Sequence, residues 1–88
     1  MKIMAVCGFG VGSSMVLKMT IEKAARQLNA DIEVENSDIT SARGAQCDAI
    51  FTSFELAETL SGSVKVPVIP IKKYMDLEEV KRALSKLV

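Results

Sequence analysis

The chain has 88 residues, and its eleven lysine and arginine residues balance eleven aspartate and glutamate residues. We expect a single domain covering residues 1–88, and the zero net charge and four aromatic residues argue against a nucleic-acid-binding protein. Histidine is absent, which excludes histidine acid–base catalysis and most zinc sites, and we expect no cofactor and no metal site.

The first third of the chain predicts a strand followed by a helix. Lys2–Val6 is almost wholly apolar and is expected to be a central strand, covered on both faces. Ser13 or Ser14 is expected to cap a helix that runs to about Asn29. Its apolar side chains at helical spacing should face the sheet, namely Leu17, Ile21, Ala24 and Leu28.

The middle third predicts two more strands with a short helix between them. Asp31–Glu35 alternates polar and apolar residues, as expected of an edge strand, and a helical turn is expected around Ile39–Arg43. Cys47–Thr52 is predicted as the third strand, with Cys47 as a buried structural thiol. A disulfide between Cys47 and Cys7 is not expected in a reducing cytosol.

The last third predicts a helix, a strand and a final helix. Ser53 precedes a short helix at Phe54–Leu60, and Gly62 is expected to end it. Val66–Ile71 contains two prolines, which suit an edge strand. Asp76 is expected to cap the final helix, whose apolar stripe is Leu77, Val80, Leu84 and Leu87.

The alternation of strands and helices predicts an α/β fold with three layers, α/β/α, around a four-stranded parallel sheet. Right-handed connections and a central first strand give the strand order 2-1-3-4, related to the flavodoxin-like arrangement. Ligands of such sheets bind at the carboxyl ends of the strands. No apolar run reaches the ~20 residues that cross a bilayer, and no signal peptide is recognisable. We therefore expect a cytoplasmic protein without membrane insertion.

A cysteine and three alternate glycines follow the first predicted strand, in the segment Cys7-Gly-Phe-Gly-Val-Gly-Ser-Ser14. Glycines destabilise a regular element, so this spacing indicates close approach of the backbone to a ligand. A turn rich in N–H groups at a helix N-terminus attracts oxyanions and favours thiolate over thiol. We therefore predict that Cys7 is a nucleophile.

Comparison with known phosphate-binding loops limits the reactions that this segment could support. The spacing G-x-G-x-G departs from the dinucleotide pattern G-x-G-x-x-G, and no lysine follows Gly12 as in a Walker A loop. A phosphatase loop of the form C-x5-R would place an arginine where this chain has Ser13. The segment therefore suits receiving a phosphoryl group and keeping it better than releasing it to water.

This segment, extended to Met19, resembles the phosphorylation loop of IIB components of the bacterial phosphoenolpyruvate-dependent sugar phosphotransferase system. The likeness covers the whole chain and is greatest for the ascorbate type of the lactose/cellobiose–ascorbate–galactitol group. It implies that Cys7 is the phosphocysteine, loaded by the phosphohistidine of a IIA protein. A membrane IIC transporter with its bound sugar would be the acceptor. The implied phosphate-binding residues are Gly8, Phe9, Gly10, Val11, Gly12, Ser13 and Ser14.

Two other functions remain open: a small cysteine-dependent phosphatase or arsenate reductase, and a regulatory IIB-like phosphorylation module. Several residues also have two interpretations. Met15, Val16 and Met19 could form a docking surface or pack on the sheet, and Phe9 could contact a partner or plug the loop. Lys72-Lys73-Tyr74 could hold an acidic partner or be simply solvated.

Overall fold

Strands and helices alternate along the chain in the computed structural model, which describes residues 1–6, 11–44 and 46–87, with backbone only for residues 11–14. The elements are β1 (Lys2–Val6), α1 (Val11–Gln27), β2 (Glu33–Ser37), α2 (Ile39–Gly44), β3 (Ala49–Thr52), α3 (Phe54–Ser61), β4 (Val68–Pro70) and α4 (Leu77–Ser85). This alternation confirms the predicted α/β class.

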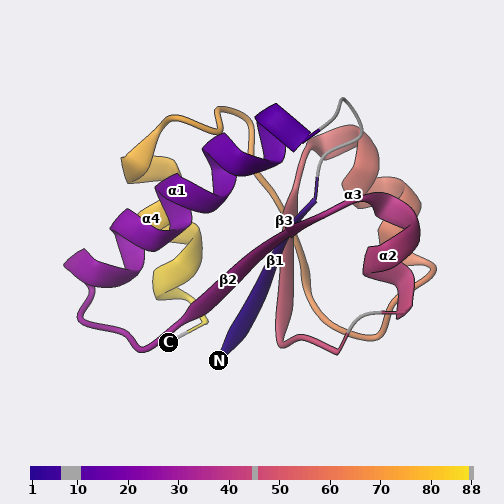
Figure 1. The fold of residues 1–88 in the computed structure, drawn as a ribbon, viewed down its shortest axis with the longest axis horizontal. Coiled ribbons are helices and arrows are strands. Elements are labelled where there is room, and N and C mark those ends of the chain that lie inside the picture. The colour runs from indigo at the N-terminus through magenta and orange to yellow at the C-terminus, as the bar shows by residue number, and fades with distance from the viewer. Residues whose placement is uncertain (7–10, 45, 88) are drawn as a thin grey trace.

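The sheet has the order β2-β1-β3-β4 with every neighbouring pair parallel, which confirms the predicted topology. β1 is central and its residues Ile3–Val6 are buried, while β2 and β4 are the edges. Because the strands are parallel, their carboxyl ends meet at one edge of the sheet, which faces upward in Figure 1. That edge holds the starts of α1 and α3 and the connection from β4 to α4.

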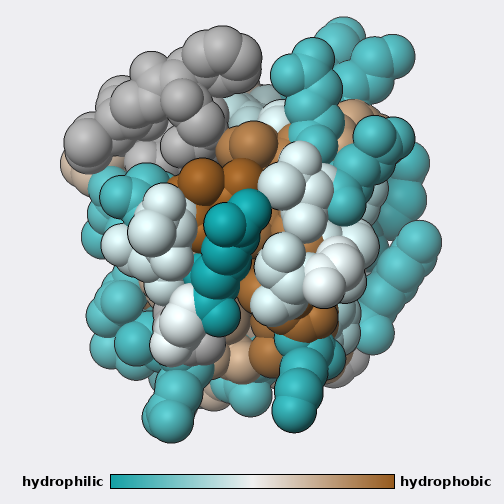
Figure 2. All heavy atoms as spheres, turned by 90° about the vertical axis from the view of Figure 1, so that its right-hand side faces the viewer, coloured by the Kyte–Doolittle hydropathy of each residue, from teal (hydrophilic) through white to brown (hydrophobic). Residues whose placement is uncertain are grey.

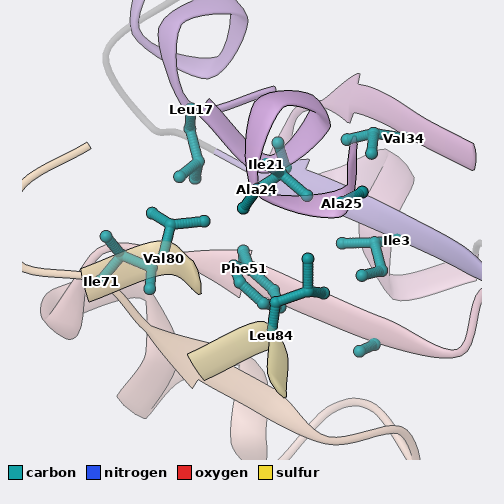
Figure 3. Close-up of a cluster of buried hydrophobic side chains, with 12 residues drawn as sticks. Ile3, Leu17, Ile21, Ala24, Ala25, Val34, Phe51, Ile71, Val80 and Leu84 are labelled. Carbon is teal, nitrogen blue, oxygen red and sulfur yellow. The ribbon is translucent and has the colours of Figure 1, made fainter. Parts of the chain in front are cut away.

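Helices cover both faces of the sheet, so the fold has the three predicted layers (Figure 1). α1 and α4 enclose the larger core cluster, in which Phe51 lies among side chains from both helices (Figure 3). The shorter α2 and α3 cover a smaller cluster, and apolar atoms remain visible between polar side chains on this face (Figure 2). The buried members of the smaller cluster are Met4, Val6, Ala42, Ile50 and Leu60.

The observed ends of the elements correct several expectations. α1 begins at Val11, so Ser13 and Ser14 lie in its first turn and neither is the predicted N-cap. β2 lies two residues later than expected, because its pairing with Lys2–Val6 of β1 selects Glu33–Ser37. β3 and β4 are shorter than predicted, since only Ala49–Thr52 and Val68–Pro70 are assigned to the sheet.

Three predicted helix ends are confirmed. The Ser53 hydroxyl accepts a hydrogen bond from the Leu56 N–H at 3.2 Å, which caps α3, and Gly62 is its C-cap. The Asp76 carboxylate caps α4 by accepting from two backbone N–H groups, at 3.1 and 3.2 Å. Within the described ranges, every helix is too short or too polar to cross a membrane.

Candidate functional site

The predicted site follows β1 at the carboxyl edge of the sheet. Cys7, Gly8, Phe9 and Gly10 lie outside the described residues, so their roles stay predictions. The other predicted phosphate-binding residues form the first turn of α1, and these are Val11, Gly12, Ser13 and Ser14. The structure therefore shows a buried central strand just before the predicted segment and a 17-residue helix that begins within it.

The N-terminus of α1 supplies hydrogen-bond donors at this edge. Helix geometry leaves the N–H groups of Val11, Gly12 and Ser13 without an acceptor inside the helix. The helix dipole also puts partial positive charge there, which stabilises an anion. A phosphoryl group or a thiolate would be favoured next to this turn, as the sequence predicts.

The strand that precedes Cys7 is fixed by a buried hydrogen bond from its neighbour. The Thr52 hydroxyl donates to the Val6 carbonyl at 2.8 Å, and both residues are fully buried. Val6 is the last residue of β1, and Thr52 is the last of β3. The bond therefore ties the ends of the two central strands together immediately before the cysteine.

A cavity of about 520 Å³ opens between the start of α3 and the segment that follows β4. One wall is formed by Ser53, Phe54 and Glu55, and the other by residues 71–75. The predicted Lys72-Lys73-Tyr74 segment forms part of that second wall. The cavity lies at the carboxyl edge, since β3 and β4 both end beside it.

The segment between β4 and α4 is held by one carboxylate. Glu79 of α4 accepts hydrogen bonds from the backbone N–H groups of Lys72 at 2.7 Å and Lys73 at 2.9 Å. The side chains of Lys72 and Lys73 are exposed and form no ion pair with any residue that the structure describes. The backbone is thus anchored while the two ammonium groups point to solvent.

Apolar side chains are exposed along the first half of α1 and after β4. Met15 is 43% exposed, Val16 36%, Met19 55% and Met75 82%. None of the three α1 residues is buried against the sheet. Val16, Met19 and Met75 also line a second cavity of about 260 Å³, whose walls include Lys23.

The second cysteine lies at the opposite end of the sheet. Cys47 precedes β3 and is partly buried, which corrects the prediction of a buried thiol within the strand. Burial and then the neighbouring Asp48 carboxylate raise the pKa of the Cys47 thiol, while the Ala49 N–H and Lys2 act in the opposite direction. The thiol form is therefore favoured, as suits a structural cysteine.

Sequence reasoning missed four residues of this edge. Thr52 and Glu79 act through hydrogen bonds to residues 46 and 6 to 7 positions away, which no local pattern reveals. Met75 and Phe54 are exposed apolar residues. The isolated methionine in the polar segment Lys72–Asp76 was a usable signal, because an apolar residue in a loop has no core to enter.

Comparison with known proteins gives consistent results. Residues 2–86 match the family model described as the lactose/cellobiose-specific IIB subunit of the PTS system. The chain is 32% identical over 87 residues to the ascorbate-specific PTS system EIIB component of Mycoplasma pneumoniae, covering 97% of this chain and 92% of the relative. The structure resembles the lactose-specific IIB domain of the Streptococcus pneumoniae phosphotransferase system, with a TM-score of 0.69 at 14% identity. That likeness covers 99% of this chain and 93% of the solved one, and it shows the fold alone.

Proposed function

The chain belongs to the lactose/cellobiose-specific IIB subunit family of the phosphotransferase system, and from that membership we propose that Cys7 carries the phosphoryl group. The observation that supports this most directly is the position of Cys7, directly after the buried central strand and four residues before α1. Orphan N–H groups and the helix dipole at that N-terminus favour both a thiolate and a bound phosphoryl group.

In the first step, the Cys7 thiolate attacks the phosphorus of a phosphohistidine on a IIA protein. The S–P bond forms as the N–P bond breaks, and the histidine nitrogen keeps the electron pair. N–H groups of Gly8, Gly10 and the first turn of α1 are proposed to hold the phosphoryl oxygens, with the Ser13 and Ser14 hydroxyls as further donors. Donors placed where charge develops lower the barrier to transfer.

In the second step, a hydroxyl of the sugar bound in a IIC transporter attacks the same phosphorus. The O–P bond forms, the S–P bond breaks, and Cys7 leaves as a thiolate while the hydroxyl gives its proton to a base. Lacking histidine, this chain offers no imidazole for either step. The donor histidine and the acceptor hydroxyl belong to the partners, so this chain needs only a thiolate and an anion site.

Ascorbate is the proposed sugar, because the curated relative at 32% identity is an ascorbate-specific component. Retention of phosphate, rather than hydrolysis, follows from Ser13, which stands where a phosphatase loop would place arginine. We also place the protein in the cytoplasm, where IIA proteins are phosphorylated.

The test reconstitutes the relay with phosphoenolpyruvate, enzyme I, the histidine phosphocarrier and the matching IIA. We expect one phosphoryl group on Cys7, its loss in Cys7→Ser and its retention in the matched control Cys47→Ser. Adding membranes that contain the cognate IIC should transfer label to ascorbate in preference to lactose, cellobiose or galactitol. Label on another residue, or turnover of a free phosphomonoester or arsenate without partners, would contradict the proposal. Phosphorylation that never reaches a sugar would instead favour a regulatory module.

A further inference from the structure

We infer that Thr52 is a positioning residue for phosphoryl transfer: its buried hydroxyl holds the end of β1, and through it the orientation in which Cys7 meets the incoming phosphorus. The inference rests on the proposed function, because it concerns the same cysteine. Thr52 acts through the carbonyl of Val6, which is the residue directly before Cys7.

The Thr52 hydroxyl is buried in a strand that is otherwise apolar. The side chains of β3 are all buried, and they belong to Ala49, Ile50, Phe51 and Thr52. A buried hydroxyl costs free energy unless it is hydrogen-bonded, and valine would fill nearly the same space without that requirement. Packing alone therefore does not account for a threonine at this position, whereas the hydrogen bond from its hydroxyl does.

This hydrogen bond joins the ends of the two central strands, which lie side by side in Figure 1. The backbone pairing of β1 with β3 has its last register pair at Ala5 and Phe51, one residue before each strand ends. The Thr52 hydroxyl donates to the Val6 carbonyl at 2.8 Å. It therefore extends the attachment of β1 to β3 by one residue, as far as the last residue of each strand.

The backbone of Thr52 is itself held by the strand on its other side. Thr52 lies opposite Pro70 in the register of β3 with β4, and its carbonyl accepts the Ile71 N–H at 2.7 Å. The next residue, Ser53, is the N-cap of α3. The end of β3 is thus a fixed support, and the Thr52 hydroxyl transfers that support to the end of β1.

Holding the Val6 carbonyl restricts the chain where it leaves the strand. A peptide unit is planar, so the carbonyl of Val6 and the amide nitrogen of Cys7 can only turn together. The rate of a nucleophilic step depends strongly on how the reacting atoms approach, and a misplacement of about 1 Å can reduce it by about a hundredfold. Loss of the bond should therefore lower the rate of transfer without affecting how tightly a partner binds.

Thr20 provides the comparison that separates this role from the ordinary one of a buried threonine. It is the other buried polar residue among the described side chains, and it is 7% exposed. Its hydroxyl donates to the Val16 carbonyl at 3.0 Å, within one turn of α1, as threonine commonly does in helices. Replacing Thr20 by valine removes a bond within a helix, whereas the same change at Thr52 removes a bond between strands.

The test follows single-turnover phosphorylation of Cys7 as the concentration of phosphorylated IIA rises, which gives a maximal rate and a half-saturating concentration. Thr52→Val keeps the packing and loses the hydroxyl, so the maximal rate should fall at least about fivefold with the half-saturating concentration unchanged. Thr52→Ser keeps the hydroxyl and loses a methyl group, so it should retain nearly the wild-type rate. Thr20→Val should leave both quantities unchanged.

Stability is measured on the same proteins by urea denaturation. Both Thr52 variants should unfold at lower urea concentration than wild type, so the presence of the hydroxyl, and not stability, should decide the rate. Thr52→Ala compared with Thr52→Ser repeats the comparison with smaller side chains, and it replaces the valine variant if that protein does not fold.

A wild-type maximal rate in Thr52→Val would overturn the inference. A Thr52→Ser protein that is slowed as much as Thr52→Val would also overturn it, because Thr52 would then act through stability alone. A change confined to the half-saturating concentration would assign Thr52 to partner binding instead. If wild type itself acquires no phosphocysteine, the proposed function fails and this inference with it; if wild type is labelled and the variants behave alike, only the positioning role fails.

Discussion

The two ends of the sheet differ in how their polar groups are satisfied. At the amino end, Cys47 lies beside Asp48, whose carboxylate accepts the Lys2 N–H at 2.7 Å. The Lys2 ammonium in turn pairs with Glu35 at 3.4 Å. The carboxyl end is the one where β1 ends, and Cys7 is the next residue in the sequence. At this end Lys72 and Lys73 have no ion pair with a described residue, and Met75 is largely exposed.

The comparison indicates that the amino end of the sheet stabilises the fold, whereas the carboxyl end is the candidate functional edge. Groups at the amino end interact with each other, so they stabilise the strand starts and need nothing from outside. Lys72 and Lys73 at the carboxyl end are anchored through their backbone while their side chains stay exposed. A thiol at the first end is expected to stay protonated, and a thiol at the second to react.

The largest expected contrast is in the reactivity of the two thiols. At pH 7, iodoacetamide should alkylate Cys7 at least about tenfold faster than Cys47, because a helix N-terminus favours the thiolate. Mass spectrometry of the single variants Cys7→Ser and Cys47→Ser measures each rate separately. Equal rates at neutral pH would mean that the two ends do not differ electrostatically.

The pH dependence of Cys47 sharpens this contrast. Because burial raises its pKa in the folded protein, its alkylation should increase at higher pH than that of a free thiol, near 8.5. A raised pKa means that the folded state keeps the proton longer than the unfolded state. Its contribution to stability is therefore complete below about pH 8.5 and is lost as pH rises through the folded pKa. Denaturation of wild type and Cys47→Ser across this range checks the sign.

A smaller contrast is expected between Glu79 and Asp48, two carboxylates that accept backbone N–H groups at opposite ends of the sheet. Glu79→Gln should lower the free energy of unfolding by about 1–2 kcal/mol, because a neutral amide replaces an acceptor of two hydrogen bonds. Asp48→Asn removes one such charged acceptor and should lower it by about 0.5–1 kcal/mol. Urea denaturation measures both, and a larger effect at Asp48 would contradict the view that the segment after β4 depends on Glu79.

The sequence predicts much of this molecule because its signals are local. Alternation of apolar runs with helical periodicity predicted the α/β class, and right-handed connections around a central first strand predicted the strand order. The caps Ser53 and Asp76 were recognisable from their side chains alone. The limits of β2 were wrong, because pairing with β1 rather than its own alternation decides where the strand begins. The start of α1 was also wrong, since the helix extends back to Val11 ahead of the serines.

The parts of the candidate site that depend on local sequence were predictable, and the parts that depend on long-range packing were not. The motif from Cys7 to Ser14 is local and could be interpreted directly, although Cys7–Gly10 lies outside the described residues. Whether Met15, Val16 and Met19 face the core or solvent depends on how α1 rotates against the sheet. The predicted stripe of Leu17 and Ile21 is buried as expected, but the exposure of positions beside that stripe depends on what packs next to them, which the sequence leaves undecided.

The next effect on the free energy of unfolding concerns the hydrogen bond from Thr52 to Val6, which joins the two central strands. Thr52→Val keeps the shape of the side chain but removes the donor to the buried Val6 carbonyl, so we expect a loss of about 1 kcal/mol. The end of β1 should also be held less firmly, which would slow phosphorylation of Cys7 by IIA. Ser53→Ala, a neighbouring change that removes only the α3 cap, is the control for stability alone. Equal transfer rates in the two variants would show that the strand bond does not position the site.

The smallest effect on stability is expected from single surface charges, and here the two ends should respond in opposite ways. Glu35→Gln removes an ion pair whose partners are 36% and 48% exposed, so the free energy of unfolding should change by no more than about 0.5 kcal/mol and less in high salt. Phosphoryl transfer should not change, because the pair lies at the far end of the sheet. Lys73→Gln breaks no ion pair with a described residue and should leave stability unaltered, yet it should slow association with the donor. Denaturation and transfer rates measured on both variants would show whether each end of the sheet serves one purpose. A Glu35→Gln variant that slows transfer would mean that long-range charge, rather than Lys72 and Lys73, guides the donor.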